Sequence, residues 1–331
     1  WTFANMNLHF ADNHDQARFL STVADLEQMV PQTALLTMIE GVGAIYYGSE
    51  QGFNTGGKDG RGAYAAMFDH NFQWDNAVGD NFNMTHWLYL KIAKLMAARR
   101  KIDAGLTYGT DLLDPQNNIF AFKRGANAFV AINGSNSQKS ATFNIGAGNF
   151  INMMDGVAVQ GPYANVTLDK WGVGVWIKDG DATLEPMVIS ASPGHSANFG
   201  GSEIILTFDQ NMDPTTTLAA VSITPSPGGT WSLIGNVLKC TGFTLNSGWQ
   251  YVIRVERTAK TAAGKAMYGG FVTKFWGSYS SPVINADIVS FYYKGGNSAK
   301  VKGNWKVTGG ANGTYTAIYD ATWNGGLESN M

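Results

Sequence analysis

The chain has 331 residues, of which 44% are apolar and 15% are charged, and its formal net charge is −2. This length is enough for two or three domains, and the apolar share excludes a disordered protein. The near-neutral charge offers no basic patch, so we expect no nucleic-acid partner. No apolar stretch reaches the ~18 residues of a membrane span, so we expect no such span.

Residues 1–103 carry the patterns of an α/β fold. A short apolar strand ends at Asp12, and the segments 15–30 and 31–43 then have apolar residues at the three- and four-residue spacing of helices. A second apolar strand, "GAIYYG", follows before a long glycine-rich loop from Ser49 to about Thr85. The segment "HWLYLKIAKLMAARRKI" is amphipathic and predicts another helix. This order of elements predicts parallel strands joined by helices.

From about Ala104 the helical spacing stops and short strands begin. Residues 104–180 predict an all-β domain, with a hairpin turn at Gly125-Ala126-Asn127. Residues 183–277 contain strands at the spacing of an immunoglobulin-like sandwich, and Cys240 within them is expected to be a buried strand thiol. Residues 282–331 hold too few strands for a complete sandwich. The fold class predicted is α/β followed by all-β.

Polar side chains follow both apolar strands of the first region. Asn13, His14 and Asp15 come after the first strand, and Tyr47 and Glu50 come at the end of the second. In folds with parallel strands, ligands bind at the carboxyl ends of the strands, so these residues predict a site there. The alternative is that an Asn or Asp here only caps a following helix.

These two stretches resemble a known family. "FADNHDQARF" resembles the seventh-strand motif of the α-amylase family, glycoside hydrolase family thirteen, in which Phe-x-x-Asn-His-Asp is followed by an Arg. "GVGAIYYGSEQG" resembles the eighth-strand region of the same enzymes. The resemblance implies that residues 1–103 are the C-terminal part of a (β/α)8 TIM barrel, with strands seven and eight, and that residues 104–180 are the β-sandwich domain that follows the barrel in this family.

The resemblance also implies roles at the first motif. Asp15 would stabilise the transition state as the third acidic residue of the site, and His14 would hydrogen-bond the same sugar ring. The alternative for His14 is a structural histidine that holds the loop. Asn13 is counted with the substrate-binding residues and is expected to fix the turn. Arg18 would support the site through a carboxylate pair. A carboxylate close to a carbon that gains positive charge favours such a transition state.

The second motif and the loop after it supply further candidates. Tyr47 is expected to bind substrate at the mouth of the site, and Glu50 to support it. Asp59 and Arg61 match the family's pair for outlying sugars, but they are only two residues apart here, and a surface ion pair is an equal alternative.

The chain lacks the nucleophile and acid/base motifs that the family's retaining mechanism needs, because both precede the first motif. We therefore expect the C-terminal fragment of a larger enzyme, inactive alone, with no signal peptide, cofactor or metal in this chain. Calcium in this family lies mainly upstream, so whether a full-length parent binds it stays open.

The last two regions resemble accessory modules. "TFDQNMDP" in residues 183–277 resembles a bacterial immunoglobulin-like domain, which usually serves as a spacer. Residues 282–331 resemble the start of a truncated starch-binding module. Trp305 and Trp323 are candidates for stacking against sugar, and a core role for each is an equal alternative.

The function expected is that of a secreted, monomeric enzyme whose partner is an α-glucan polysaccharide or oligosaccharide, and which cleaves α-1,4 bonds with retention. One alternative is a transglycosylase of the same family, such as a cyclodextrin glucanotransferase. The other is a non-catalytic polysaccharide-binding surface protein.

Overall fold

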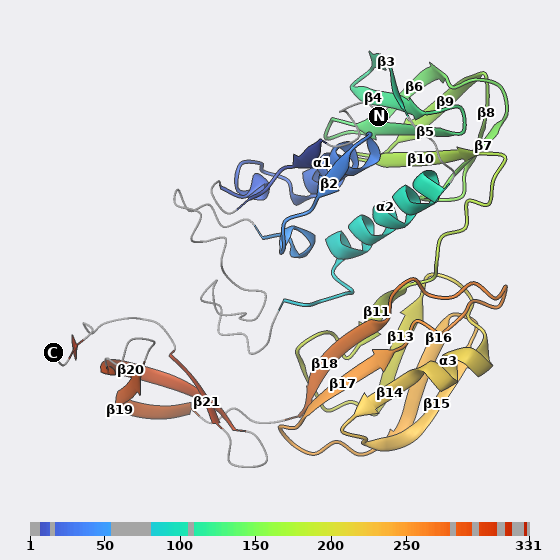
Figure 1. Cartoon of the computed structure of the whole chain (residues 1–331). Coiled ribbons are helices and arrows are strands. Elements are labelled where there is room, and N and C mark those ends of the chain that lie inside the picture. Colours follow the sequence, from blue (N-terminus) through green and yellow to red (C-terminus); the bar gives the residue numbers. More distant parts are fainter. Residues whose placement is uncertain are drawn as a thin grey trace. The chain divides into compact units, whose positions relative to one another are not determined.

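A computed structural model describes residues 7–13, 17–53, 81–104, 109–278, 283–292, 298–309, 315–319 and 328–329. The described residues divide into two compact units. The first holds 7–53 and 83–185, and the second holds 81–82 and the residues from 186 onward. Most of the described elements are strands, with few helices (Figure 1). No helix in the described ranges is both long and apolar enough to cross a membrane.

The first unit begins with the predicted parallel pair. Strand β1 (Leu8–Phe10) pairs in parallel with β2 (Val42–Ala44), with Leu8 opposite Val42. Helix α1 (Met29–Met38) connects them, and Pro31 stands in its first turn, as expected.

The helix expected over residues 15–30 is wrong for the part that the structure describes. This part contains two short 3-10 turns, η2 (Phe19–Ser21) and η3 (Leu26–Gln28), before α1 begins. The Asp25 side chain accepts a hydrogen bond from Glu27 N and so caps η3. Aspartate side chains that bind nearby backbone N–H groups favour caps and turns over a continuous helix.

Helix α2 (Trp87–Ala104) is the predicted amphipathic helix. Leu88, Ile92 and Leu95 are buried along one side of it. Near its end Arg99 donates hydrogen bonds to Ile39 O at 2.8 Å and to Gly41 O at 3.0 Å. Arg99 also donates to Thr37 O in the last turn of α1, so α2 satisfies a carbonyl that the end of α1 leaves open.

A six-stranded antiparallel sheet follows, in the order β3-β4-β5-β10-β7-β8, and β6 and β9 form a separate pair. The predicted hairpin is confirmed, since β4 and β5 pair with Arg124 opposite Ala128. The strands of this region are β3 (Thr110–Gln116), β4 (Ile119–Arg124), β5 (Ala128–Asn133), β6 (Lys139–Asn144), β7 (Asn149–Asn152), β8 (Ala158–Gln160), β9 (Tyr163–Leu168) and β10 (Val173–Lys178).

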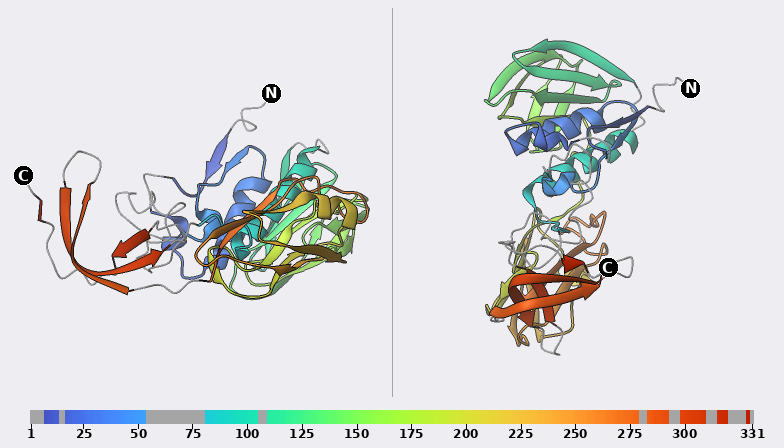
Figure 2. Two further views of the ribbon diagram at one scale, coloured as in Figure 1. Left: turned by 90° about the horizontal axis from the view of Figure 1, so that it is seen from below. Right: turned by 90° about the vertical axis from the view of Figure 1, so that its left-hand side faces the viewer.

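The two faces of this sheet bury two different cores. On one face, Phe122 and Val130 join Met38 of α1 and Leu95 of α2 in one apolar cluster. On the other face, Phe129 packs with side chains of the β6–β9 pair in a second cluster. Both helices lie on the same side of the sheet (Figures 1 and 2). The α/β elements and the β elements of this unit therefore fold around a shared core.

The second unit contains two four-stranded sheets, β11-β13-β16-β15 and β12-β18-β17-β14. Cys240 in β16 is fully buried, as predicted, and burial raises the pKa of its thiol. The elements are β11 (Val188–Ser192), β12 (Ala197–Phe199), β13 (Glu203–Phe208), α3 (Pro214–Ala220), β14 (Val221–Thr224), β15 (Gly228–Ile234), β16 (Val237–Phe243), β17 (Gln250–Val255) and β18 (Phe271–Gly277).

The last described strands form a further sheet, in which β19 (Val283–Tyr292), β20 (Ser298–Gly309) and β21 (Tyr315–Tyr319) are neighbours and β22 (Glu328–Ser329) pairs with β20. Trp305 belongs to β20, where its backbone lies opposite Ile284 and Tyr319. Trp323 lies outside the described residues.

Candidate functional site

The best-defined polar cluster of the first unit joins the segments that follow β1 and β2. Asp12, just after β1, is 4% exposed, and Arg18 is completely buried. Arg18 Nη1 lies 3.7 Å from Asp12 Oδ2, and the Ser49 hydroxyl donates to that same Oδ2 at 2.7 Å. Ser49 belongs to the 3-10 turn η4 (Ser49–Gln51), so one carboxylate connects the ends of two parallel strands.

The same carboxylate also holds the chain that returns after the first motif. Phe19 N, at the start of η2, donates to Asp12 Oδ1 at 2.6 Å. Asp12 therefore contacts the backbone of Phe19, seven residues further along the chain. The alternative of a helix cap at the end of the first strand falls largely on residues 14–16, which lie outside the described residues.

Aromatic rings surround the Arg18 guanidinium. Its Cζ lies 4.4 Å from the ring centroid of Tyr46, 5.1 Å from that of Tyr47 and 5.7 Å from that of Phe53. A buried guanidinium is attracted by ring faces, and the rings exclude water from its ion pair with Asp12. The cluster is therefore mainly structural, and residues that follow both strands set its position.

A second group of titratable side chains consists of Glu50, His86 and Tyr89. Burial raises the pKa of the Glu50 carboxyl, and the pKa of Tyr89 is raised by burial and by the negative charge of Glu50. His86 Nδ1 lies 3.1 Å from Glu50 O, and burial lowers the pKa of the imidazole. Gln51 Nε2 donates to Asn83 O at 3.1 Å, so η4 is attached to the segment that leads into α2.

The structure places only some of the predicted site residues. Asn13 is half-buried beside Asp12, and Tyr47 is 37% exposed with its ring against Arg18. Arg18 and Glu50 lie in the two groups described above. Trp305 lies in β20, and the other predictions fall on residues outside the described ranges, namely His14, Asp15, Asp59, Arg61 and Trp323.

Sequence reasoning grouped Asp12 with the polar residues at the end of the first strand but assigned no role to Asp12 or Ser49. The available signal was their place, since Asp12 directly follows an apolar strand and Ser49 follows the Tyr46-Tyr47-Gly48 end of the other. Among the described residues, no group of three or more His, Cys, Asp or Glu side chains is placed to hold a metal ion.

Comparison with known proteins connects this architecture to a family. Residues 110–178, which hold the six-stranded sheet and the β6–β9 pair, match the family model "Alpha amylase, C-terminal all-beta domain". Cyclomaltodextrin glucanotransferase from Bacillus sp. (strain 1011) is 32% identical over 206 residues, which is 57% of this chain and 26% of that protein. Alpha-amylase 1 of Schwanniomyces occidentalis is 29% identical over 143 residues, which is 40% of this chain and 26% of that protein.

Among solved structures, the alpha-amylase from Malbranchea cinnamomea matches 55% of this chain and 39% of its own, with 20% identity and a TM-score of 0.45. The chain spans about a quarter of the length of the two curated relatives. Residues 110–178 thus match the C-terminal all-beta domain of the α-amylase family, and the chain is similar in sequence to a cyclomaltodextrin glucanotransferase and an alpha-amylase.

Proposed function

We propose that this chain is part of a retaining α-glucan hydrolase of the α-amylase type, which cleaves α-1,4-glucosidic bonds in starch-like polysaccharides. The observation that carries the proposal is the buried contact of Asp12 with Arg18, Ser49 and Phe19 N. This contact lies at the carboxyl ends of two parallel strands, where sites form, and Asn13, His14 and Asp15 follow Asp12 directly in the sequence.

The parallel pair supports a barrel origin for residues 1–103. Parallel strands are normally covered on both faces, yet Leu8 is 59%, Phe10 is 47% and Val42 is 56% exposed. Two strands do not close a barrel. We infer that β1 and β2 are strands seven and eight of a (β/α)8 barrel whose other strands cover these side chains.

In this enzyme Asp15 would place a carboxylate beside the sugar carbon that gains positive charge, and His14 would donate a hydrogen bond to a hydroxyl of the same ring. Both interactions strengthen as the transition state forms. The nucleophile and the general acid/base are two further carboxyl groups, ~5 Å apart in retaining enzymes, and would come from the preceding strands. Arg18 would act as a positioning residue through Asp12.

The test is a starch assay on two proteins. One is this chain, and the other is a longer protein that carries the nucleophile and acid/base strands ahead of it. We expect no reducing-sugar release from the chain, release by the longer protein, and loss of most of that rate in its Asp15→Asn variant. Hydrolysis by the chain alone would contradict the proposal. A longer protein that binds starch without cleaving it would favour the non-catalytic polysaccharide-binding protein instead.

A transglycosylase is the second candidate, because one matching relative is a cyclomaltodextrin glucanotransferase. Chromatography of the products separates the two, since transfer yields cyclic or longer glucans whereas hydrolysis yields shorter linear ones. We further propose an extracellular, monomeric enzyme, with residues 183–277 as an immunoglobulin-like spacer and residues 282–331 as the start of a starch-binding module, in which Trp305 and Trp323 would stack on sugar.

A further inference from the structure

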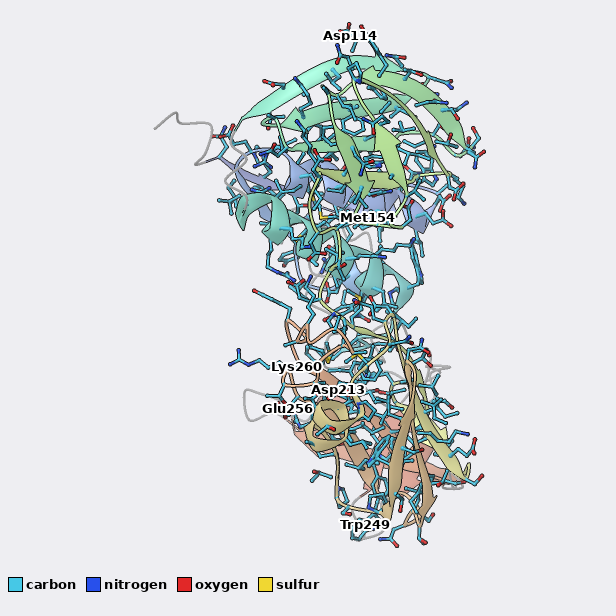
Figure 3. The ribbon with its side chains drawn as sticks, turned by 90° about the vertical axis from the view of Figure 1, so that its right-hand side faces the viewer. Asp114, Met154, Asp213, Trp249, Glu256 and Lys260 are labelled. Carbon is cyan, nitrogen blue, oxygen red and sulfur yellow. The ribbon has the colours of Figure 1, made fainter. Side chains whose placement is uncertain are left out.

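A second hollow of the first unit lies apart from the Asp12 cluster. It has a volume of about 490 Å³ and is formed by the start of α2, the segment around η3 and the turn that joins β9 to β10. Two tryptophans line it, Trp87 as the first residue of α2 and Trp171 in the turn. Met154, labelled in Figure 3, also lines it. This volume falls in the range of small-molecule sites, about 300–1,000 Å³.

Trp171 is held in place by several contacts. Its indole Nε1 donates to Asp25 Oδ2 at 2.9 Å, and its backbone N donates to Ser135 O at 3.0 Å. Its φ of +52° is rare for a bulky side chain, and such strained residues cluster at functional sites. Gly172 N donates to Asp169 O at 2.8 Å and closes the turn. The ring therefore has a fixed orientation before any ligand binds, which lowers the entropy cost of binding.

The charges around the hollow are balanced. Three acidic side chains and three basic side chains line it, namely Glu27, Asp155, Asp169, Lys91, Lys94 and Lys170. Lys170 Nζ is already paired, at 3.0 Å from Asp25 Oδ2 and 3.4 Å from Glu27 Oε2. This balance favours neither an anion nor a cation. It suits an uncharged ligand that has many hydroxyl groups to donate and accept hydrogen bonds.

We propose that this hollow binds an uncharged α-1,4-linked gluco-oligosaccharide, with Trp87 and Trp171 as its stacking surfaces. Indole rings present a large apolar face beside a polar edge, and this matches the apolar face and hydroxyl rim of a pyranose. The α-1,4 linkage rests on the proposed function, whereas the choice of a neutral sugar rests on the two indoles and the balanced charges. The site would hold polysaccharide without taking part in its cleavage.

The experiment is a calorimetric titration of the 331-residue chain with maltotetraose. Trp87→Ala is the main variant, because Trp87 is 40% exposed and its removal leaves the apolar core intact. Trp171→Ala is the second variant, and Trp249→Ala is the control, since Trp249 belongs to the other unit and is labelled in Figure 3. We expect binding to weaken tenfold or more in each of the first two variants and to stay unchanged in the control.

Three results would overturn the proposal: no binding by the unaltered chain, unchanged binding by Trp87→Ala, or binding of cellotetraose as tight as that of maltotetraose. A failure of the proposed function gives a different pattern. In that case the longer protein releases no sugar from starch, and the titration of this chain still depends on Trp87.

Discussion

The indole Nε1 of Trp171 donates a 2.9 Å hydrogen bond to Asp25 Oδ2, across 146 residues of sequence. The same carboxylate accepts from Glu27 N at 3.0 Å and lies 3.0 Å from Lys170 Nζ. One aspartate therefore caps η3 and also attaches the turn between β9 and β10 to the start of the helical region.

Replacing Asp25 should lower the stability of the first unit. Asp25→Ala removes a cap, which costs about 1 kcal/mol, and it also removes the partner of Trp171 and Lys170. Thermal unfolding followed by tryptophan fluorescence measures the effect at pH 7. Asp155→Ala is the control, because Asp155 accepts a local hydrogen bond, from Val157 N at 2.8 Å. Equal melting temperatures for the Asp25 variant and the unaltered chain would contradict the role.

The effect of Asp25 should depend on pH. The Glu27 N–H, followed by Lys170, holds the pKa of the Asp25 carboxyl below its usual value of 3.8. The folded state therefore binds a proton more weakly than the unfolded state, so the stabilisation is present above pH 3.8 and is lost as the pH falls through the lowered pKa. We expect the melting difference between the two proteins to shrink below that pH. A constant difference from pH 7 to pH 2 would show that the charge is not involved.

Removing the Arg18 side chain should lower the free energy of unfolding far more than removing that of a surface arginine. Arg18→Ala leaves the Asp12 carboxylate buried without its cation, which costs about 3–5 kcal/mol. Urea unfolding measures the loss. Arg100→Ala is the matched control in the same unit, because Arg100 lies 3.4 Å from Glu185 with both side chains partly exposed, and such pairs contribute about 0–1 kcal/mol.

A double-mutant cycle then tests the contact itself. Asp12→Ala and Arg18→Ala should be non-additive by about 0.5–3 kcal/mol, as expected for residues that share one buried network. Strictly additive losses would mean that the two side chains stabilise the fold independently, and the positioning role proposed for Arg18 would then have no support.

Glu50 should make the first unit less stable as the pH rises. Burial raises the pKa of its carboxyl above the usual 4.5, so the folded state holds the proton more tightly than the unfolded state. Stability therefore falls as the pH rises from 4.5 through the raised pKa. We expect Glu50→Gln to melt at a higher temperature than the unaltered chain at pH 7, and the two to converge below pH 4.5.

The titration of His86 does not change this comparison of melting temperatures. Its pKa is lowered by burial, but it titrates in both proteins and so cancels in the difference. If Glu50→Gln melted lower at pH 7, the buried carboxylate would be making a stabilising contact that outweighs its desolvation.

Gly174 in β10 should not tolerate a side chain. A Cβ at this position would lie 2.1 Å from Cη2 of the Trp176 ring, which is buried in the second apolar cluster. Overpacking of this kind typically costs about 1–3 kcal/mol. Gly134→Ala is the control, because its Cβ would meet only Asn118 O, at 3.5 Å. Urea midpoints compare the two variants, and similar values would show that the ring moves freely.

Several elements could be predicted from local sequence because their signals are local. The α2 helix follows from the spacing of Leu88, Ile92 and Leu95, and the β4–β5 hairpin follows from its turn. Two motifs were enough to indicate the family, whose C-terminal domain then matched residues 110–178. The helix expected over residues 15–30 was wrong because Asp25 binds a nearby backbone N–H, which periodicity does not show.

The sequence by itself therefore determined α2, the β4–β5 hairpin and the strand ends at which polar residues gather. Only the tertiary structure decided that Asp12 is the buried partner of Arg18 and Ser49, and that Trp87 and Trp171 line one hollow. The physical reason is distance along the chain. Ser49 is 37 residues from Asp12, and Trp171 is 146 from Asp25, so no local pattern encodes which side chains will share one buried contact.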